Sequence, residues 1–367
     1  MPYCSTIAGN DFMNAYAVIM AGGGGTRFWP LSRVSEPKQL LNLSGKDVMI
    51  NETIARVKKV VSDENSVYVV TNAAQAGKTV AITKGKIPPV NVLSEPLAKN
   101  TAACIGYAAA KILKERGDGV IIVTPSDAYV KNEEKYAELL RSAVSAAESE
   151  DCIVTVGVVP TFPATGYGYI KYEISDNPVK SVISFVEKPD EKTAEKYLES
   201  GDYVWNCGVF VWKASVIMDN IKKYLPELYD GLMRIYAAVG TPEEAKTVSE
   251  IYPALPSVSI DYGVMEKAEN IKVVTGEFGW NDVGSWDMMG VLHRADENRN
   301  VIVGDAVVCG TKNSTIYSSG RTIAVLGMDG VVVAETPDAV LVCPKEKAQD
   351  IKKIIESLKA SGRTELL

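Results

Sequence analysis

The sequence predicts an α/β protein with a Rossmann-like, mixed but mostly parallel sheet flanked by helices, followed by a small C-terminal β domain that a helix closes. The first observation is an alternation of apolar, β-branched runs with helix-periodic stretches, which is typical of βαβ units. The second is a change after about residue 298 to short β runs, which end in an amphipathic stretch at 345–360. The strand-like runs cover 17–20, 67–71, 120–124 and 153–159, and the helix-like stretches cover 51–61, 101–114 and 133–147.

The part of the chain after about residue 160 has a mixed pattern, with shorter strands, aromatic residues and helices expected at 191–200 and 214–224. We expect this half to cover the sheet and to shape a pocket. Ligands of open parallel sheets bind at the carboxyl ends of the strands. Two motifs stand at such ends, AGGGGTR after the first strand and TPSD at 124–127.

Three segments are expected: an N-terminal extension over 1–14, the main α/β domain over 15–294, and a β-rich domain over 295–367 that ends in a helix. The first segment lacks the basic and apolar parts of a signal peptide, and Met13 is an alternative to Met1 as the translation start. The β runs of the last segment are not regular enough to predict how they wind.

Composition excludes several classes of partner. The chain has 367 residues, 46% of them hydrophobic, so it can bury a large core. A net charge of -7 gives no reason to expect nucleic acid or an anionic membrane as a partner. No apolar run approaches the roughly 20 residues of a membrane span. The six cysteines include no CxxC pair, so we expect neither disulfides nor a zinc cluster, and a reduced cytoplasm fits.

The stretch AGGGGTRFWPLSR at 21–33 predicts a phosphate site. Glycines allow a tight turn and bring backbone N–H groups close to an anion. Arg27 would add a planar donor fork, and Lys38 in SEPKQLL a second cation, although each alone could be a solvated surface charge. A flexible turn is the alternative. The expected triphosphate contacts are Gly22, Gly23, Gly25, Thr26, Arg27 and Lys38.

Two other phosphate motifs are rejected. AGKT at 76–79 resembles the end of a P-loop, but the motif needs a glycine where Asn72 stands, so a solvated turn is expected there. A nicotinamide-binding fingerprint would need a glycine in place of Arg27.

Further motifs follow in order: EPLAKNTAA, TPSD, TGYGYI, FVEKP, WNCGVFVW, SIDYGVMEK and FGWNDVGSW. Together with AGGGGTRFWPLSR and PKQLL, they resemble the sugar-phosphate nucleotidyltransferases, and WPLSR resembles the mannose-1-phosphate guanylyltransferase branch. The resemblance covers residues 15 to about 290 and implies a nucleotidyltransferase catalytic domain over 15–294. One departure is Ala128, which follows Asp127 where the branch usually has a histidine; the chain's single histidine is His293.

The resemblance implies that GTP and mannose 1-phosphate form GDP-mannose and pyrophosphate, by in-line attack of the sugar phosphate on the α-phosphorus. Such transfers depend on positioning and charge neutralisation and need no protein nucleophile. Mg²⁺ is the expected cofactor, because it binds one or two carboxylates together with phosphates and water. Asp127 and Asp282 are its expected ligands, with a helix cap or turn former as the alternative for a strand-end aspartate. The implied catalytic set is Arg27, Lys38, Asp127, Lys188 and Asp282.

Binding roles also follow from the matched motifs. Glu187 is expected to accept sugar hydroxyls and Lys188 to contact the sugar phosphate. Trp205 and Trp280 are expected to pack rather than stack on the sugar. The remaining sugar-pocket residues would be Gly168, Asn206 and Asp261. For the nucleotide, Asp127 joins the loop residues, and Glu95, Asn100 and Thr101 are candidates to contact guanine, although Asn100 or Thr101 could be an N-cap alone.

Other interpretations stay open. One is a pyrophosphorylase for another sugar 1-phosphate or nucleotide. Another is a silent regulatory relative that binds sugar nucleotides, which the retained charges disfavour. A bifunctional form with isomerase activity is not expected, because no histidine follows His293. The expected partners are GTP and mannose 1-phosphate, and a homodimer is left open.

Overall fold

The computed structural model describes residues 14–61 and 63–367. Apart from Asn14, the expected N-terminal extension and the Met13 start lie outside the described residues. None of the helices in these two ranges combines the length and apolar character that a membrane crossing needs.

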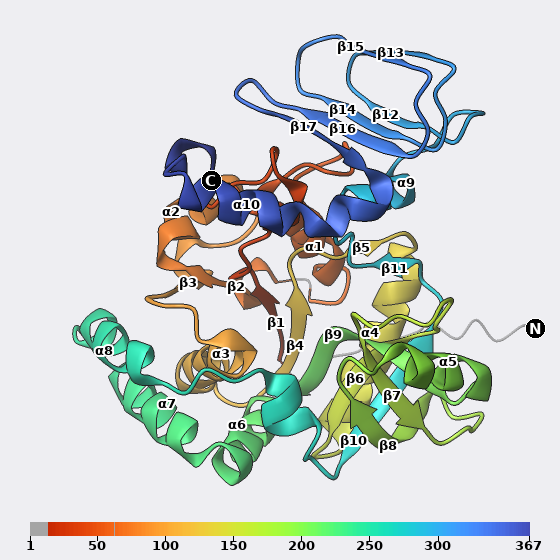
Figure 1. Cartoon of the computed structure of the whole chain (residues 1–367). Coiled ribbons are helices and arrows are strands. Elements are labelled where there is room, and N and C mark those ends of the chain that lie inside the picture. The colour runs from red at the N-terminus through yellow and green to blue at the C-terminus, as the bar shows by residue number, and fades with distance from the viewer. Residues whose placement is uncertain (1–13, 62) are drawn as a thin grey trace, which may run out of the picture.

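The main sheet has nine strands in the described chain, in the order β3-β2-β1-β4-β9-β6-β10-β8-β7 (Figure 1). Strands β1, β2, β3 and β4 pair in parallel, as do β6 and β10, whereas β9 is antiparallel to β4 and β6. Of these strands β8 and β9 run against the rest, so the predicted mixed, mostly parallel sheet is confirmed. The bounds are β1 Ala15–Met20, β2 Val67–Asn72, β3 Val92–Glu95, β4 Val120–Pro125, β6 Ile153–Val158, β7 Gly168–Tyr172, β8 Val179–Val186, β9 Tyr203–Lys213 and β10 Ile271–Gly276.

Helices cover both faces of this sheet (Figure 1). Alternate residues of β1 point to opposite faces: Val18 belongs to the core that includes α3 and α6, and Ile19 to the core that includes α1 and α4. Strands buried on both sides explain why the sequence shows continuous apolar runs. The helices are α1 Met49–Val57, α2 Ala73–Ile82, α3 Asn100–Arg116, α4 Glu133–Ser149, α5 Glu191–Ser200, α6 Ala214–Tyr224, α7 Pro226–Ala238, α8 Glu244–Ile251, α9 Met289–Leu292 and α10 Ile351–Ala360.

Two local predictions are wrong. The helix expected at 51–61 ends at Val57, because the next turn tightens and Val60 N–H donates to the Val57 carbonyl at 2.9 Å. AGKT is part of helix α2 rather than a solvated turn. The Asn72 side chain caps this helix by accepting the N–H of Gln75 at 3.0 Å.

The C-terminal strands form short parallel coils. Strands β12, β14 and β16 stack in parallel, with Val301 beside Thr315 and Thr315 beside Val332, and β13 stacks on β15. Antiparallel β17 and then α10 close the stack, as the sequence predicts for a β region ending in a helix. The bounds are β12 Val301–Val303, β13 Ala306–Cys309, β14 Thr315–Ser318, β15 Ile323–Leu326, β16 Val331–Glu335 and β17 Val340–Pro344.

Candidate nucleotide and sugar-phosphate site

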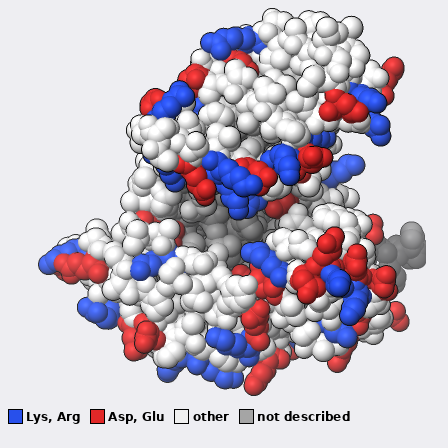
Figure 2. All heavy atoms as spheres, in the orientation of Figure 1, with Lys and Arg blue, Asp and Glu red and all other residues white. Residues whose placement is uncertain are grey.

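Two adjoining cavities lie at the carboxyl ends of β1 and β4. We call them the wide pocket, of about 510 Å³, and the loop pocket, of about 440 Å³; Asp282 lines both. The surface is visibly hollowed below α10 (Figure 2). The loop pocket contains the predicted residues Gly25, Thr26, Arg27, Lys38, Asp127 and Asp282. The wide pocket contains Gly22, Gly23, Glu95, Asn100, Thr101, Gly168, Glu187, Lys188, Asn206, Asp261 and Asp282.

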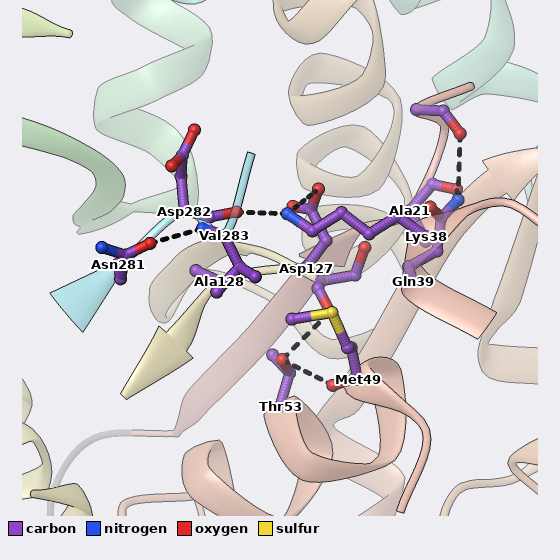
Figure 3. Close-up of polar contacts among 12 residues, drawn as sticks. Ala21, Lys38, Gln39, Met49, Thr53, Asp127, Ala128, Asn281, Asp282 and Val283 are labelled. Atoms are coloured by element: carbon purple, nitrogen blue, oxygen red, sulfur yellow. Dashed lines mark hydrogen bonds and ion pairs between the residues drawn. The ribbon is translucent and has the colours of Figure 1, made fainter. Parts of the chain in front are cut away.

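The glycine loop is held from one side and open on the other. Gly25 has φ 47°, and a Cβ there would lie 2.4 Å from the backbone nitrogen of Lys38. Gly23 and Gly24 meet nothing within 4 Å in the same test, so their backbone is free to approach a ligand. Gln39 donates to the carbonyls of Ala21 at 2.8 Å and Gly23 at 3.1 Å, which fixes the loop (Figure 3).

The two predicted cations differ in environment. Arg27 is exposed in the loop pocket and makes no hydrogen bond or ion pair with the described residues. Lys38 is 6% exposed, and its Nζ lies 3.1 Å from Asp127 Oδ2 and also donates to the Asp282 carbonyl. Arg27 is therefore an unpaired charge available to an anion, whereas Lys38 already joins the two aspartate loops (Figure 3).

A small sheet brings the two aspartates to one pocket. Strand β5 (Tyr129–Val130), which follows Asp127, pairs with β11 (Trp280–Asn281), which precedes Asp282. The Asp282 carboxylate points away from Lys38 in Figure 3, and its Oδ1 accepts the hydroxyl of Tyr167 at 2.9 Å. Burial, together with the Asp282 carboxylate, raises the pKa of Tyr167, so its hydroxyl remains a donor.

The alternatives considered for Asp127 and Asp282 are a helix cap and a turn former. Nearby asparagines take both of these roles. Asn281 Oδ1 accepts the Val283 N–H at 2.7 Å and forms the turn beside Asp282. Asn132 caps α4 by accepting the Lys135 N–H at 3.1 Å. Val283 itself has φ 44°, a conformation that costs a β-branched residue energy and is common at functional sites.

The Asp127 loop rests on α1. The guanidinium of Arg56 is buried, donates to the Ala128 carbonyl at 2.8 Å and to Thr53 Oγ1 at 2.7 Å, and has no carboxylate partner among the described residues. Thr53 in turn donates to the Ser126 carbonyl at 3.2 Å. Loss of hydration lowers the pKa of Arg56. The departure from the family pattern at Ala128 therefore leaves a backbone anchor in place.

The wide pocket holds a carboxylate oxygen that lacks a donor. Gly168 leaves room for it, because a Cβ at residue 168 would lie 2.4 Å from Glu187 Oε2 where that oxygen now stands. That oxygen is buried without a hydrogen-bond partner, while Oε1 lies 3.3 Å from Lys188 Nζ. Asp261 accepts from Asn206 Nδ2 at 3.0 Å. Burial raises the pKa of both Glu187 and Asp261. Buried acceptors are normally satisfied by a donor, and a ligand hydroxyl is one group that can supply it here.

The predicted base contacts Glu95, Asn100 and Thr101 also line the wide pocket. Glu95 is 3% exposed, burial raises its pKa, and one of its oxygens accepts the hydroxyl of Tyr252. Asn100 has φ 63°, and Thr101 Oγ1 accepts the N–H of Ile260 at 2.8 Å. The Asn100 Oδ1 accepts the Thr101 N–H at 2.8 Å at the start of α3, whereas Lys99 makes no side-chain cap bond. A capping role therefore stays open for Asn100 beside the proposed contact with the base.

Aromatic residues pack around Tyr167, the hydrogen-bond donor to Asp282, which lines both pockets. Tyr167 lies edge-on to Trp205 and Trp280, with ring centroids 5.2 Å apart in each pair. Trp205 is 4% exposed in the core, which confirms packing, and half-buried Trp280 also lines the wide pocket.

Sequence reasoning missed four supporting residues. Gln39 and Tyr167 stand inside PKQLL and TGYGYI, so their motifs were a usable signal. Arg56 and Tyr252 lie in ordinary helical sequence, and nothing local marks their contacts with the Asp127 loop and Glu95.

The site has a glycine loop after the first parallel strand, an unpaired Arg27 and walls rich in acceptors. These features fit the class of nucleotide-binding transferases. Residues 16–299 match the family described as "Nucleotidyl transferase", and residues 304–358 match the "MannoseP isomerase/GMP-like beta-helix domain". The chain belongs to the nucleotidyl transferase family.

Its relatives narrow the class. The chain is 36% identical to the mannose-1-phosphate guanylyltransferase of Escherichia coli, covering 95% of this chain and 74% of the relative. It is 38% identical to the xanthan biosynthesis protein XanB of Xanthomonas campestris, with 95% and 74% covered. The crystal structure titled mannose-1-phosphate geranyltransferase, from Thermus thermophilus, has a TM-score of 0.86 and 36% identity, covering 95% of this chain and 100% of the other.

Proposed function

We propose that the protein is an enzyme, a mannose-1-phosphate guanylyltransferase that makes GDP-mannose and pyrophosphate from GTP and mannose 1-phosphate. The observation that carries this is the junction of the two pockets at Asp282, with the cationic glycine loop on one side and hydroxyl acceptors on the other. The printed names of the relatives at 36% identity support the choice of substrates.

Each pocket takes one part of the ligands. The triphosphate lies along the glycine loop, where Gly23 and Gly24 leave their backbone open and Arg27 supplies an unpaired charge. In the wide pocket, Glu187 accepts sugar hydroxyls and Lys188 meets the sugar phosphate. The remaining proposed contacts are Gly22, Gly25, Thr26, Lys38 and Asp127 for the nucleotide phosphates, Gly168, Asn206 and Asp261 for the sugar, and Glu95, Asn100 and Thr101 for the base.

The chemistry asks for alignment of two anions. An oxygen of the sugar phosphate forms a bond to the α-phosphorus of GTP. At the same time, the bond between the α-phosphorus and the oxygen that bridges it to the β-phosphorus breaks, and pyrophosphate leaves with that oxygen. No proton transfer is needed between the reacting atoms. Arg27, Lys38 and Lys188 offset the repulsion between the phosphates, and the fixed loop holds the line of attack.

Nucleotidyl transferases typically use a divalent metal, and Mg²⁺ is the ion we propose. The donor set fits, because Asp127 and Asp282 both supply carboxylate oxygens and both line the loop pocket. Mg²⁺ suits such a site because it takes one or two carboxylates and fills its shell with phosphate oxygens and water. When bound, it supplies positive charge that stabilises the charge developing on the phosphates.

The test is pyrophosphate release measured over a matrix of four nucleoside triphosphates and several sugar 1-phosphates. We expect the highest kcat/KM with GTP and mannose 1-phosphate. Highest turnover with UTP and glucose 1-phosphate would replace the substrate assignment. Absence of release with every pair, together with a raised Tm in the presence of GDP-mannose, would favour the regulatory interpretation.

A further inference from the structure

The third hydrophobic core of the described chain connects the loop pocket to the C-terminal region, which we define as residues 300–367. In Figure 1, α10 lies between the C-terminal strands and the part of the molecule that carries α1. This core contains residues from behind the glycine loop, from behind Asp282, and from the C-terminal region: Phe28 and Trp29; Val283, Trp286 and Met289; and Val332, Leu341, Ile351, Ile355, Leu358 and Leu366, among others.

Trp29 is where the three parts meet. Its indole N–H donates to the Leu366 carbonyl at 2.8 Å, next to the last residue of the chain. Its own carbonyl accepts the indole N–H of Trp286 at 3.0 Å. Both bonds are buried, since Trp29 is 6% exposed and Trp286 is fully enclosed. Trp29 stands two residues after Arg27, and Trp286 four residues after Asp282.

A second contact reaches the Asp282 wall directly. Gln349 Nε2 donates to Ser285 Oγ at 2.7 Å, and Ser285 is fully buried three residues after Asp282. An ion pair of 2.9 Å between Arg33 and Asp338 adds a link on the glycine-loop side. The C-terminal region therefore holds both walls of the loop pocket through hydrogen bonds, and each wall also contributes to the shared core.

We propose that the C-terminal region sets the distance between the two walls of the loop pocket, with Trp29, Trp286 and Gln349 as positioning residues for nucleotidyl transfer. This inference rests on the proposed function. Arg27 lies on one wall and Asp282 on the other, so a shift between the walls misaligns the α-phosphorus with its attacking oxygen. A misplacement of about 1 Å can cost on the order of a hundredfold in rate. The proposed sugar contacts Glu187, Asn206 and Asp261 lie directly after β8, on β9 and in the segment before β10, outside this core.

The test uses Trp29→Phe and Trp286→Phe in the full-length protein, because phenylalanine keeps an aromatic ring and removes the N–H donor. Gln349→Ala is a milder variant at an exposed position, useful if a tryptophan variant fails to fold. Trp212→Phe is the matched control. Trp212 is fully buried in the core that includes α3 and α6, and its indole nitrogen has no hydrogen-bond partner.

We expect each of the three variants to lower kcat/KM for GTP by roughly tenfold to a hundredfold while leaving KM for mannose 1-phosphate near the wild-type value. Trp212→Phe should lower Tm without this split between substrates. Variants that lose Tm but keep wild-type kcat/KM for GTP would overturn the proposal.

Hydrogen exchange separates this proposal from the proposed function. Backbone N–H groups at 21–29 and 282–288 should exchange faster in Trp29→Phe and Gln349→Ala than in wild type, without any substrate present. If wild-type protein released no pyrophosphate but exchange still increased in both segments, the function would fail and the linkage would stand. Unchanged exchange in both segments would overturn the linkage whatever the activity.

Discussion

Glu187 gives a prediction at the scale of a single residue, because its Oε2 is buried without a donor. Burial raises its pKa above the ordinary value of 4.5. At pH values between the ordinary pKa and the raised one, the unfolded chain has lost the proton that Glu187 keeps in the folded protein. The free energy of unfolding therefore falls as pH rises through this window. Glu187→Gln removes the ionisable group, and its stability should decline less over the same range.

The same variant should lose activity, because the amide has one acceptor oxygen where the carboxylate has two, and it carries no charge. A hydrogen bond to a charged group is worth about 1.5–3 kcal/mol, so we expect roughly a tenfold to hundredfold loss in kcat/KM for mannose 1-phosphate. Thermal melts from acidic to neutral pH check the prediction on stability, and pyrophosphate release checks the prediction on activity. A variant whose stability falls as steeply with pH as that of wild type, or one that is fully active, would contradict them.

Asp127 and Asp282 give a second prediction at this scale. Asparagine at either position keeps the shape and removes one charge from the proposed metal site. Turnover should fall by orders of magnitude, since each ~1.4 kcal/mol of lost charge stabilisation is tenfold in rate. The double variant should be little worse than either single one, because residues that act as a unit are not additive. Tm and the Mg²⁺ dependence of pyrophosphate release are measured together; a folded, active Asp282→Asn with an unchanged Mg²⁺ requirement would remove Asp282 from the site.

At the scale of an element, the glycine loop predicts that Gly25→Ala lowers both stability and activity. Gly25→Ala forces a Cβ to 2.4 Å from the Lys38 backbone at φ 47°, so the loop must move away from Lys38. We expect a lower Tm and a large loss of kcat/KM for GTP. Gly77→Ala is the matched control, because a Cβ there meets nothing within 4 Å and Gly77 lies in α2, outside both pockets. Equal kinetics for the two alanine variants would show that the loop tolerates displacement.

At the scale of the whole molecule, the third core predicts cooperative unfolding. Its residues come from 28–49, from 283–289 and from the C-terminal region, so the β coils cannot lose their packing without exposing Phe28, Trp29 and Trp286. We expect one transition in calorimetry, with the calorimetric and van't Hoff enthalpies in agreement. A separate early transition assigned to residues 300–367 would contradict this.

Much of this protein is determined by its sequence alone. Local apolar periodicity is enough to place the strands before AGGGGTR and TPSD and the helices at 191–200 and 214–224, whose bounds match α5 and α6. The same patterns indicate a parallel sheet, and the resemblance of ordered motifs indicates a nucleotidyltransferase. All of the predicted site residues line one of the two pockets.

Tertiary structure alone decided which of these residues meet and what holds them. Lys38 and Asp127 are 89 residues apart in the chain, and Trp29 and Leu366 are 337 apart, yet each pair is joined by a hydrogen bond. No local pattern encodes such contacts, because chain packing creates them only after strands from distant segments align. The coiling of the C-terminal strands has the same origin, since each coil is stabilised by its neighbours rather than by its own sequence. Burial likewise decides the pKa of Glu187, because water is excluded only once the surrounding elements have packed. The hydrogen bond of Arg56 to the Ala128 carbonyl also forms only in the packed structure.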